Sequence, residues 1–247
     1  MIGSALKSGR LFLYRTKANI QNKTIVHFLH IGKSGGTAIK SALGNKDKPL
    51  KYNDYYLFSH PHNFTLMHTH KGEKVFFFVR DPIDRFISGF FSRQRKGMPR
   101  IYREWSKGEK IAFEHFNTPN ELGMALSSEN TERKQQAIDA MKSIYHVKSS
   151  YWDWFKNPDY LLSRLQDIAF VGTQQNLNDD FLHLKTKLGL PESVQLPQDK
   201  VNTHKNPDHL DKHLDSQAVA NLKKWYASDY MFLDLLAEKG FITMANI

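Results

Sequence analysis

The segment at residues 74–79 (KVFFFV) constrains the fold most, because it is a short and almost continuous apolar run. Such a run is typical of a strand, and apolar side chains on both of its faces must be covered from both sides. Asp81 and Pro82 follow it, and a proline suits the first turn of a helix, where its missing N–H costs nothing. Residues 83–95 then predict a helix with one apolar stripe. The stripe consists of Ile83, Phe86, Ile87, Phe90 and Phe91.

The same alternation of short apolar runs and helical patterns recurs along the chain. Residues 24–31 and 168–171 predict two more buried strands, followed by helices over about 37–43 and 177–188. The segment 98–160 is mostly helical in pattern, 191–214 predicts a long loop, and 216–239 predicts one long helix. Strands separated by helices indicate a three-layer α/β fold, with a central parallel sheet flanked by helices. We expect a single domain over residues 1–247, with 1–23 as an N-terminal extension.

Composition narrows the classes of function. The 247-residue chain has no cysteine, which excludes disulfides, Cys-ligated zinc, iron–sulfur clusters and a thiol nucleophile. It has no stretch of the roughly 20 apolar residues that a membrane span needs, so we expect a cytoplasmic protein. The 35 Lys and Arg residues against 25 Asp and Glu give a net charge of +10, which suits an anionic ligand.

The first segment with chemistry follows the first predicted strand. In HIGKSGGT (residues 30–37), Gly32, Gly35 and Gly36 let backbone N–H groups turn toward one point, at the start of a helix. Lys33 and the hydroxyls of Ser34 and Thr37 add donors, so the segment predicts a phosphate cradle, although a plain turn would use similar residues. It is not a Walker A motif, since His27 stands where the first glycine would fall. We therefore expect a P-loop-like nucleotide-binding core.

The second segment is VRDPIDRFISGFF at residues 79–91. A guanidinium and a serine hydroxyl can together bind a second phosphate group, because guanidinium binds phosphate bidentately. Arg80 ends the strand, and Arg85 and Ser88 lie three residues apart on one face of the helix, so either arginine could act with Ser88. For Arg85 we favour the other interpretation, an ion pair with Asp81 or Asp84. Ligands of such sheets bind at the carboxyl ends of the strands, where both segments begin.

Together the two segments resemble the cofactor signatures of sulfotransferases that use 3′-phosphoadenosine 5′-phosphosulfate (PAPS). HIGKSGGT resembles their 5′-phosphosulfate loop, commonly P-K-[ST]-G-[ST]-[ST], with Gly32 in place of the proline and Gly36 in place of a hydroxyl residue. VRDPIDRFISGFF is very similar to their 3′-phosphate segment, R-[DE]-P-x-x-R-x-x-S. A third segment, VGTQQNLNDDFLHL at 171–184, resembles a strand–helix segment of the carbohydrate-type branch of these enzymes, which is also called the sulfotransferase family 2-like branch.

The resemblance implies a fold, a co-substrate and site residues. Lys33, Ser34, Gly35, Gly36 and Thr37 would bind the 5′ end of PAPS, and Lys33 would stabilise the leaving phosphate. Arg80 and Ser88 would hold the 3′-phosphate, residues around Asn202 to Lys205 would complete the adenine site, and no metal is needed.

Histidines between the two segments supply the expected base. In the uronyl 2-O-sulfotransferase branch the base lies in an H-G-H-like segment at this place, and SHPH (59–62) is similar. The small residue before it favours His60 as the base, with His62 as the second choice. Two residues apart on an extended segment, both would point the same way and could share one site. Neutral imidazole can accept a proton from a hydroxyl near pH 7.

We therefore expect a PAPS-dependent sulfotransferase that transfers a sulfuryl group to a hydroxyl of a glycan, small alcohol or lipid head group. No nucleic-acid partner is expected, and the pattern does not decide the acceptor or the oligomeric state. Two alternatives remain. A kinase with a degenerate P-loop would need Asp81 as its Mg²⁺ ligand. A non-catalytic polyanion-binding module would use the basic residues between 93 and 103, which are Arg93, Arg95, Lys96, Arg100 and Arg103.

Overall fold

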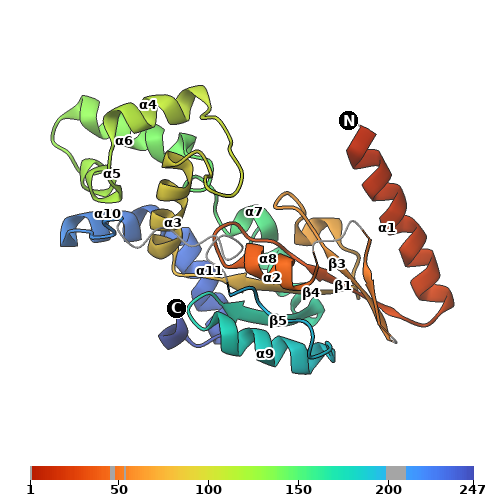
Figure 1. Ribbon diagram of the computed structural model, residues 1–247. Helices are drawn as coiled ribbons and strands as arrows, with labels where there is room; N and C mark the ends of the chain where they lie inside the picture. Colours follow the sequence, from red (N-terminus) through yellow and green to blue (C-terminus); the bar gives the residue numbers. More distant parts are fainter. Residues whose placement is uncertain (1, 45–47, 53, 199–209) are drawn as a thin grey trace.

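The computed structural model describes residues 2–44, 48–52, 54–198 and 210–247, and its centre is a five-stranded sheet (Figure 1). The strands are β1 (Thr24–Phe28), β2 (Leu50–Lys51), β3 (Tyr55–Ser59), β4 (Lys74–Val79) and β5 (Ile168–Thr173), in the order β2-β3-β1-β4-β5. All neighbouring pairs are parallel except β2 with β3. The prediction of a parallel sheet is therefore confirmed for four strands, and β2 corrects it. Only three residues separate β2 from β3, too few for the crossover that a parallel pair needs, so the two strands pair antiparallel.

The sheet is covered by helices on both faces, as the apolar run in β4 predicts. Phe76 and Phe78 pack with α2 (Gly36–Ala42) and α9 (Leu177–Leu188), whereas Val75, Phe77 and Val79 face α7, α8 and α11. Those three helices span Trp152–Phe155, Pro158–Leu162 and Ala227–Glu238. Alternate side chains of one strand thus enter two different cores.

The N-terminal segment is a helix, α1 (Ile2–Ile20), where the sequence analysis expects only an extension. Leu11 and Ala18 pack against Ile25, Tyr56 and Phe58 of β1 and β3. The described part of the chain contains no helix that is long and apolar enough to cross a membrane.

A second, all-helical core lies beside the sheet around α3 (Pro82–Gln94), the helix predicted at 83–95. Figure 1 shows other helices gathered around α3. These are α4 (Lys107–His115), α5 (Pro119–Ala125), α6 (Thr131–Ser143) and α10 (Ser216–Trp225). Phe86, Phe90 and Phe91 of the predicted stripe point into this core.

The last predicted helix is two helices, which corrects the expectation of one over 216–239. α10 packs in the helical core and α11 packs against the sheet, and they meet at Tyr226. Tyr226 is buried, and its hydroxyl donates to the carbonyl of Val147 (2.8 Å). Of the predicted loop at 191–214, the described residues contain no helix or strand.

Candidate functional site

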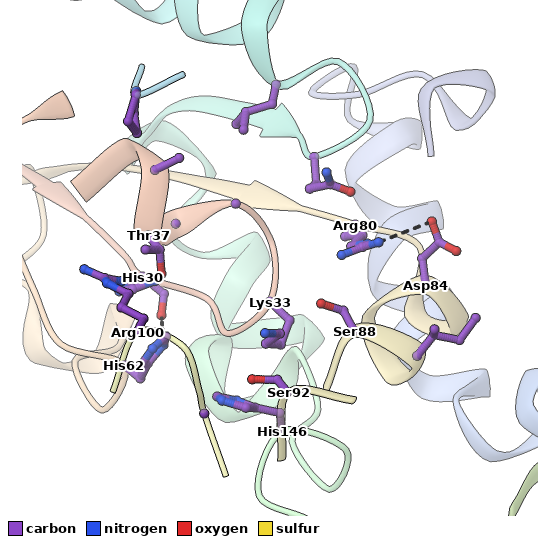
Figure 2. Close-up of a pocket in the computed structure, with 18 of the residues that line it drawn as sticks. His30, Lys33, Thr37, His62, Arg80, Asp84, Ser88, Ser92, Arg100 and His146 are labelled. Carbon is purple, nitrogen blue, oxygen red and sulfur yellow. Dashed lines mark hydrogen bonds and ion pairs between the residues drawn. The ribbon is translucent and has the colours of Figure 1, made fainter. Parts of the chain in front are cut away.

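A cleft of about 1440 Å³ opens beside the carboxyl ends of β1 and β4, and it is lined by both predicted segments. Lys33, Gly35, Gly36 and Thr37 line it from the loop after β1. Arg80 and Ser88 line it from the end of β4 and from α3. Figure 2 shows Lys33, Arg80 and Ser88 around one shared space. The two segments, far apart in the sequence, therefore form one site.

The loop from 32 to 36 is shaped by two unusual backbone conformations. Lys33 has φ 67° and Gly35 has φ 80°, both in the left-handed region, which is uncommon for a lysine. A Cβ on Gly36 would lie 2.1 Å from the ring of His30, so only glycine fits there. α2 begins at Gly36 after Gly35, which offers no side-chain cap to its first N–H groups. Ser34 is buried (1% exposed), and its side chain does not line the cleft.

The Lys33 amine is recessed among other cations. Burial and the neighbouring Arg80 and Arg95 lower the pKa of Lys33 to about 7. Among the described residues, no carboxylate forms an ion pair with it. An anion bound here would stabilise the charged amine, so the position fits a negatively charged ligand.

Arg80 is the second recessed cation. Its backbone N–H donates to the hydroxyl of Tyr151 (2.9 Å), which fixes the point where β4 ends. Its guanidinium lies 3.7 Å from Asp84, a carboxylate that is 58% exposed. Burial lowers the pKa of Arg80, and its buried Nε has no hydrogen-bond partner. A buried donor left unpaired is costly, so this nitrogen also fits a bound anion.

Both carboxylate oxygens of Asp81 form hydrogen bonds within the protein. One of its oxygens accepts from the N–H groups of Ile83 (2.8 Å) and Asp84 (2.9 Å), so it caps α3. The other accepts from the hydroxyl of Tyr230 (2.9 Å). Both oxygens of the only candidate Mg²⁺ ligand of the kinase alternative are thus engaged.

Arg85 forms a buried ion pair, as expected, but with a different partner. Its guanidinium lies 3.2 Å from Asp229 of α11 and donates to the carbonyl of Ser149, instead of meeting Asp81 or Asp84. It also stacks on the ring of Tyr151 (4.3 Å). The reason is the orientation of α3, because the face of this helix that carries Arg85 points into the molecule, toward α11.

The predicted basic cluster between 93 and 103 does not form one exposed patch. Arg93 is buried in a bidentate pair with Glu109 (2.6 and 3.0 Å), and Lys96 pairs with Glu104 (2.6 Å). Arg100 and Arg103 line the cleft. The structure therefore does not provide the exposed basic surface that a polyanion-binding module would need.

The two candidate histidines lie in different surroundings. β3 ends at Ser59 and the chain turns at 62–63, so His60 and His62 do not share an extended segment, contrary to the expectation. His62 lines the cleft, whereas His60 is 9% exposed and stacks on Phe64 (3.4 Å between ring centroids). Of the two, only His62 is among the residues that line the cleft with Lys33 and Arg80, and it is labelled in Figure 2.

His60 belongs to a buried polar chain. Its Nε2 lies 2.9 Å from Nδ1 of His27, and Nε2 of His27 lies 3.0 Å from Glu73. Glu73 in turn accepts two hydrogen bonds from Arg15 of α1 (2.6 and 2.8 Å). Burial would raise the pKa of Glu73, but its bonds from Arg15 and His27 lower it below the ordinary value. These hydrogen bonds connect α1 to the sheet, and His60 therefore contributes to the fold and not to the cleft.

The tautomer of His62 follows from its partner. Its Nδ1 lies 2.9 Å from the backbone oxygen of His30, and a carbonyl can only accept, so Nδ1 carries the hydrogen. Nε2 is then an acceptor. Burial lowers the pKa of His62, so the ring is neutral at pH 7. A neutral imidazole with a lone pair in a cationic cleft can take a proton from a hydroxyl.

Two further histidines line the cleft and were not predicted from the sequence. His30, two residues after β1, packs its ring on His62 (3.9 Å between centroids), and His146 lines the cleft from the segment after α6. The position of His30 at a strand end could have pointed to it, but nothing in the sequence around His146 could. The expected adenine residues, Asn202 to Lys205, lie outside the described residues.

Residues 16–235 match the model of a family described as the sulfotransferase family. A search of curated proteins finds no match.

Proposed function

The chain belongs to the sulfotransferase family, and we propose that it transfers a sulfuryl group from PAPS to an acceptor hydroxyl. PAPS would supply the sulfuryl group, with 3′,5′-ADP as the leaving group. The observation that carries the proposal is the pair of recessed cations, Lys33 and Arg80, at the ends of two neighbouring parallel strands. PAPS has one anionic group at each end of its ribose, which matches two separate cationic positions.

The two ends of the nucleotide have different receptors. The unpartnered Nε of Arg80 and the hydroxyl of Ser88 would bind the 3′-phosphate. Lys33 and the N–H groups of the loop before α2 would bind the 5′ end, as in a P-loop-like nucleotide-binding core. Charge that develops on the leaving 5′-phosphate is then met by a cation already in place, which favours the transition state.

His62 is the base in this proposal. The acceptor oxygen forms a bond to sulfur while the bond from sulfur to the 5′-phosphate oxygen breaks. The acceptor proton passes to Nε2 of His62, and His30 holds the ring through its carbonyl. His60, the first choice of the sequence analysis, would support the fold through His27 and Glu73 instead.

The experiment that tests the proposal compares three ligands. 3′,5′-ADP should bind tightly, ATP with Mg²⁺ weakly, and heparin only in a salt-sensitive way. Incubation with labelled PAPS and a cell extract should then label an acceptor, which mass spectrometry identifies. Tighter binding of ATP with Mg²⁺ than of 3′,5′-ADP would contradict the proposal and favour a kinase.

A further inference from the structure

One side-chain hydroxyl holds the backbone of Arg80, just beyond the edge of the sheet. β4 ends at Val79, which is the last of its residues to pair with β5. At the next residue Tyr151 takes the place of a neighbouring strand, because its hydroxyl accepts from the N–H of Arg80 (2.9 Å) and donates to the carbonyl of Arg80. Both backbone hydrogen-bonding groups of Arg80 therefore depend on one phenol oxygen, 71 residues away in the sequence.

Tyr151 is itself held in place by its neighbours. It immediately precedes α7 and is fully buried. Its N–H donates to Asp229 of α11 (2.7 Å), the same carboxylate that pairs with Arg85. The guanidinium of Arg85 lies 4.3 Å from the centre of the Tyr151 ring, and the ring of Phe232 stacks on it at 4.9 Å between centroids. Packing from α3 and α11 therefore sets the position of the hydroxyl.

The hydroxyl of Tyr151, and not its ring, is what Arg80 requires. Burial raises the pKa of Tyr151, so the phenol stays protonated at neutral pH. A protonated phenol can donate one hydrogen bond and accept another at the same time. Phenylalanine would fill the same space, but it would leave the partly buried N–H and carbonyl of Arg80 without this partner, which is unfavourable.

The side chain of Arg80 depends on its backbone for its direction. Its buried Nε has no hydrogen-bond partner, and its ion pair with Asp84 is long (3.7 Å) and involves a mostly exposed carboxylate. Such a pair holds a long side chain weakly, because exposed ion pairs contribute little. A backbone bound at both its hydrogen-bonding groups keeps the guanidinium at the space that it shares with Ser88 (Figure 2). A phosphate then meets a cation that is already ordered, which favours binding.

We propose that Tyr151 is a positioning residue for the 3′-phosphate, because it holds the backbone of Arg80 so that the guanidinium of Arg80 meets this phosphate. Tyr151 is not one of the residues that line the cleft, so it acts on the nucleotide only through Arg80. This assignment rests on the proposed transfer from PAPS, which places Arg80 at the 3′ end. Recognition of the 3′-phosphate then depends on α11, which lies outside both nucleotide segments.

Tyr151→Phe tests this role, because it removes the hydroxyl and keeps the ring. Isothermal titration calorimetry should show that the variant binds 3′,5′-ADP about three- to tenfold more weakly than the wild type does, the effect of about one lost hydrogen bond. The affinity for 5′-AMP, which lacks the 3′-phosphate, should change less than about twofold, a difference of roughly 0.4 kcal/mol. Neither measurement requires the acceptor.

Tyr230→Phe is the matched control. The Tyr230 hydroxyl donates to Asp81 (2.9 Å), the residue after Arg80, and the other oxygen of Asp81 can still cap α3 in the variant. Urea denaturation should show a similar loss of unfolding free energy in both tyrosine variants. Only Tyr151→Phe should change the ratio of the affinities for 3′,5′-ADP and 5′-AMP, because a loss of stability alone affects both nucleotides equally.

A double variant separates an effect through Arg80 from any other effect. When Arg80→Ala is already present, Tyr151→Phe should not weaken 3′,5′-ADP further. An undiminished further loss in the double variant, an equal loss for both nucleotides in Tyr151→Phe, or the same change of ratio in Tyr230→Phe would overturn the inference. A wild type that binds 5′-AMP as tightly as 3′,5′-ADP would instead overturn the proposed function, so the two failures are distinguishable.

Discussion

In the part of the chain that the structure describes, buried cations have a carboxylate partner in the interior of the molecule but lack a buried one in the cleft. In the interior, Arg85 is buried and meets the carboxylate of Asp229 at 3.2 Å. In the cleft, Lys33 is recessed with no ion pair among the described residues, and Arg80 has only the exposed Asp84 at 3.7 Å. Both arrangements cost desolvation, but only the first is compensated within the chain.

The difference separates structural from functional cations in one short motif. Arg80 and Arg85 are only five residues apart in the sequence, yet the structure gives a buried carboxylate partner to Arg85 alone. An uncompensated cation in a recess is stable only because the cleft stays open to water and anions, so it marks a ligand site. A compensated one marks a packing contact. The following predictions test this distinction, from the largest expected effect to the smallest.

The largest expected effect separates His62 in the cleft from His60 in the interior. His62→Ala should lower kcat by about 10²–10⁴-fold, because it removes the proposed base from the cleft. The affinity for 3′,5′-ADP should not change, as measured by isothermal titration calorimetry. His60→Ala should instead lower the free energy of unfolding by about 1–3 kcal/mol, since it leaves the buried Nδ1 of His27 without its partner. If His60→Ala abolished transfer in a stably folded protein and His62→Ala did not, the assignment of the base would be reversed.

Removal of a charge should have opposite consequences for stability in the two regions. Asp229→Ala leaves Arg85 buried without a carboxylate and should cost about 3–5 kcal/mol of unfolding free energy, measured by urea denaturation. Lys33→Met removes a recessed cation that has no ion pair and should not destabilise the fold. Equal losses of stability in the two variants would show that Lys33 is a structural cation like Arg85.

The proposed contact between Arg80 and the 3′-phosphate can be tested by comparing the binding of two nucleotides. Arg80→Ala should weaken 3′,5′-ADP by about ten- to a hundred-fold, the loss of one charge-assisted hydrogen bond. The affinity for 5′-AMP, which lacks the 3′-phosphate, should change little. Calorimetric titration of both nucleotides measures the difference, and an equal loss for both would remove Arg80 from the 3′ site.

The smallest effect is a pH dependence of nucleotide binding. With its pKa lowered to about 7, Lys33 is half charged at pH 7 in the free protein. A bound phosphate favours the charged amine and raises this pKa, so binding takes up a proton above pH 7. The affinity for 3′,5′-ADP should therefore fall about fivefold between pH 7 and pH 8. Lys33→Met should bind more weakly but without this slope, and a wild type without the slope would place Lys33 outside the phosphate site.

Local pattern was enough to predict much of the fold. The apolar run at 74–79 became β4 without a shift in its bounds, and the stripe after Pro82 became α3. These features depend on side-chain periodicity and on the backbone preferences of proline and glycine, which are local properties. β3 was missed because its run, Tyr55–Ser59, is short and lies beside polar residues that hide it. The helix α1 was missed because a weakly apolar, basic segment gains stability mainly from packing on β1 and β3.

By itself, the sequence determined which residues could make a nucleotide site: the glycine-rich loop with Lys33 and the segment with Arg80 and Ser88. Only the tertiary structure decided which side chains face it. The turn after Ser59 sends His62 into the cleft and His60 into the interior. The placement of α11 gives Arg85 its carboxylate and leaves Arg80 to the cleft. Such choices depend on contacts between segments far apart in the chain, and no local pattern encodes the direction from which a distant element will approach.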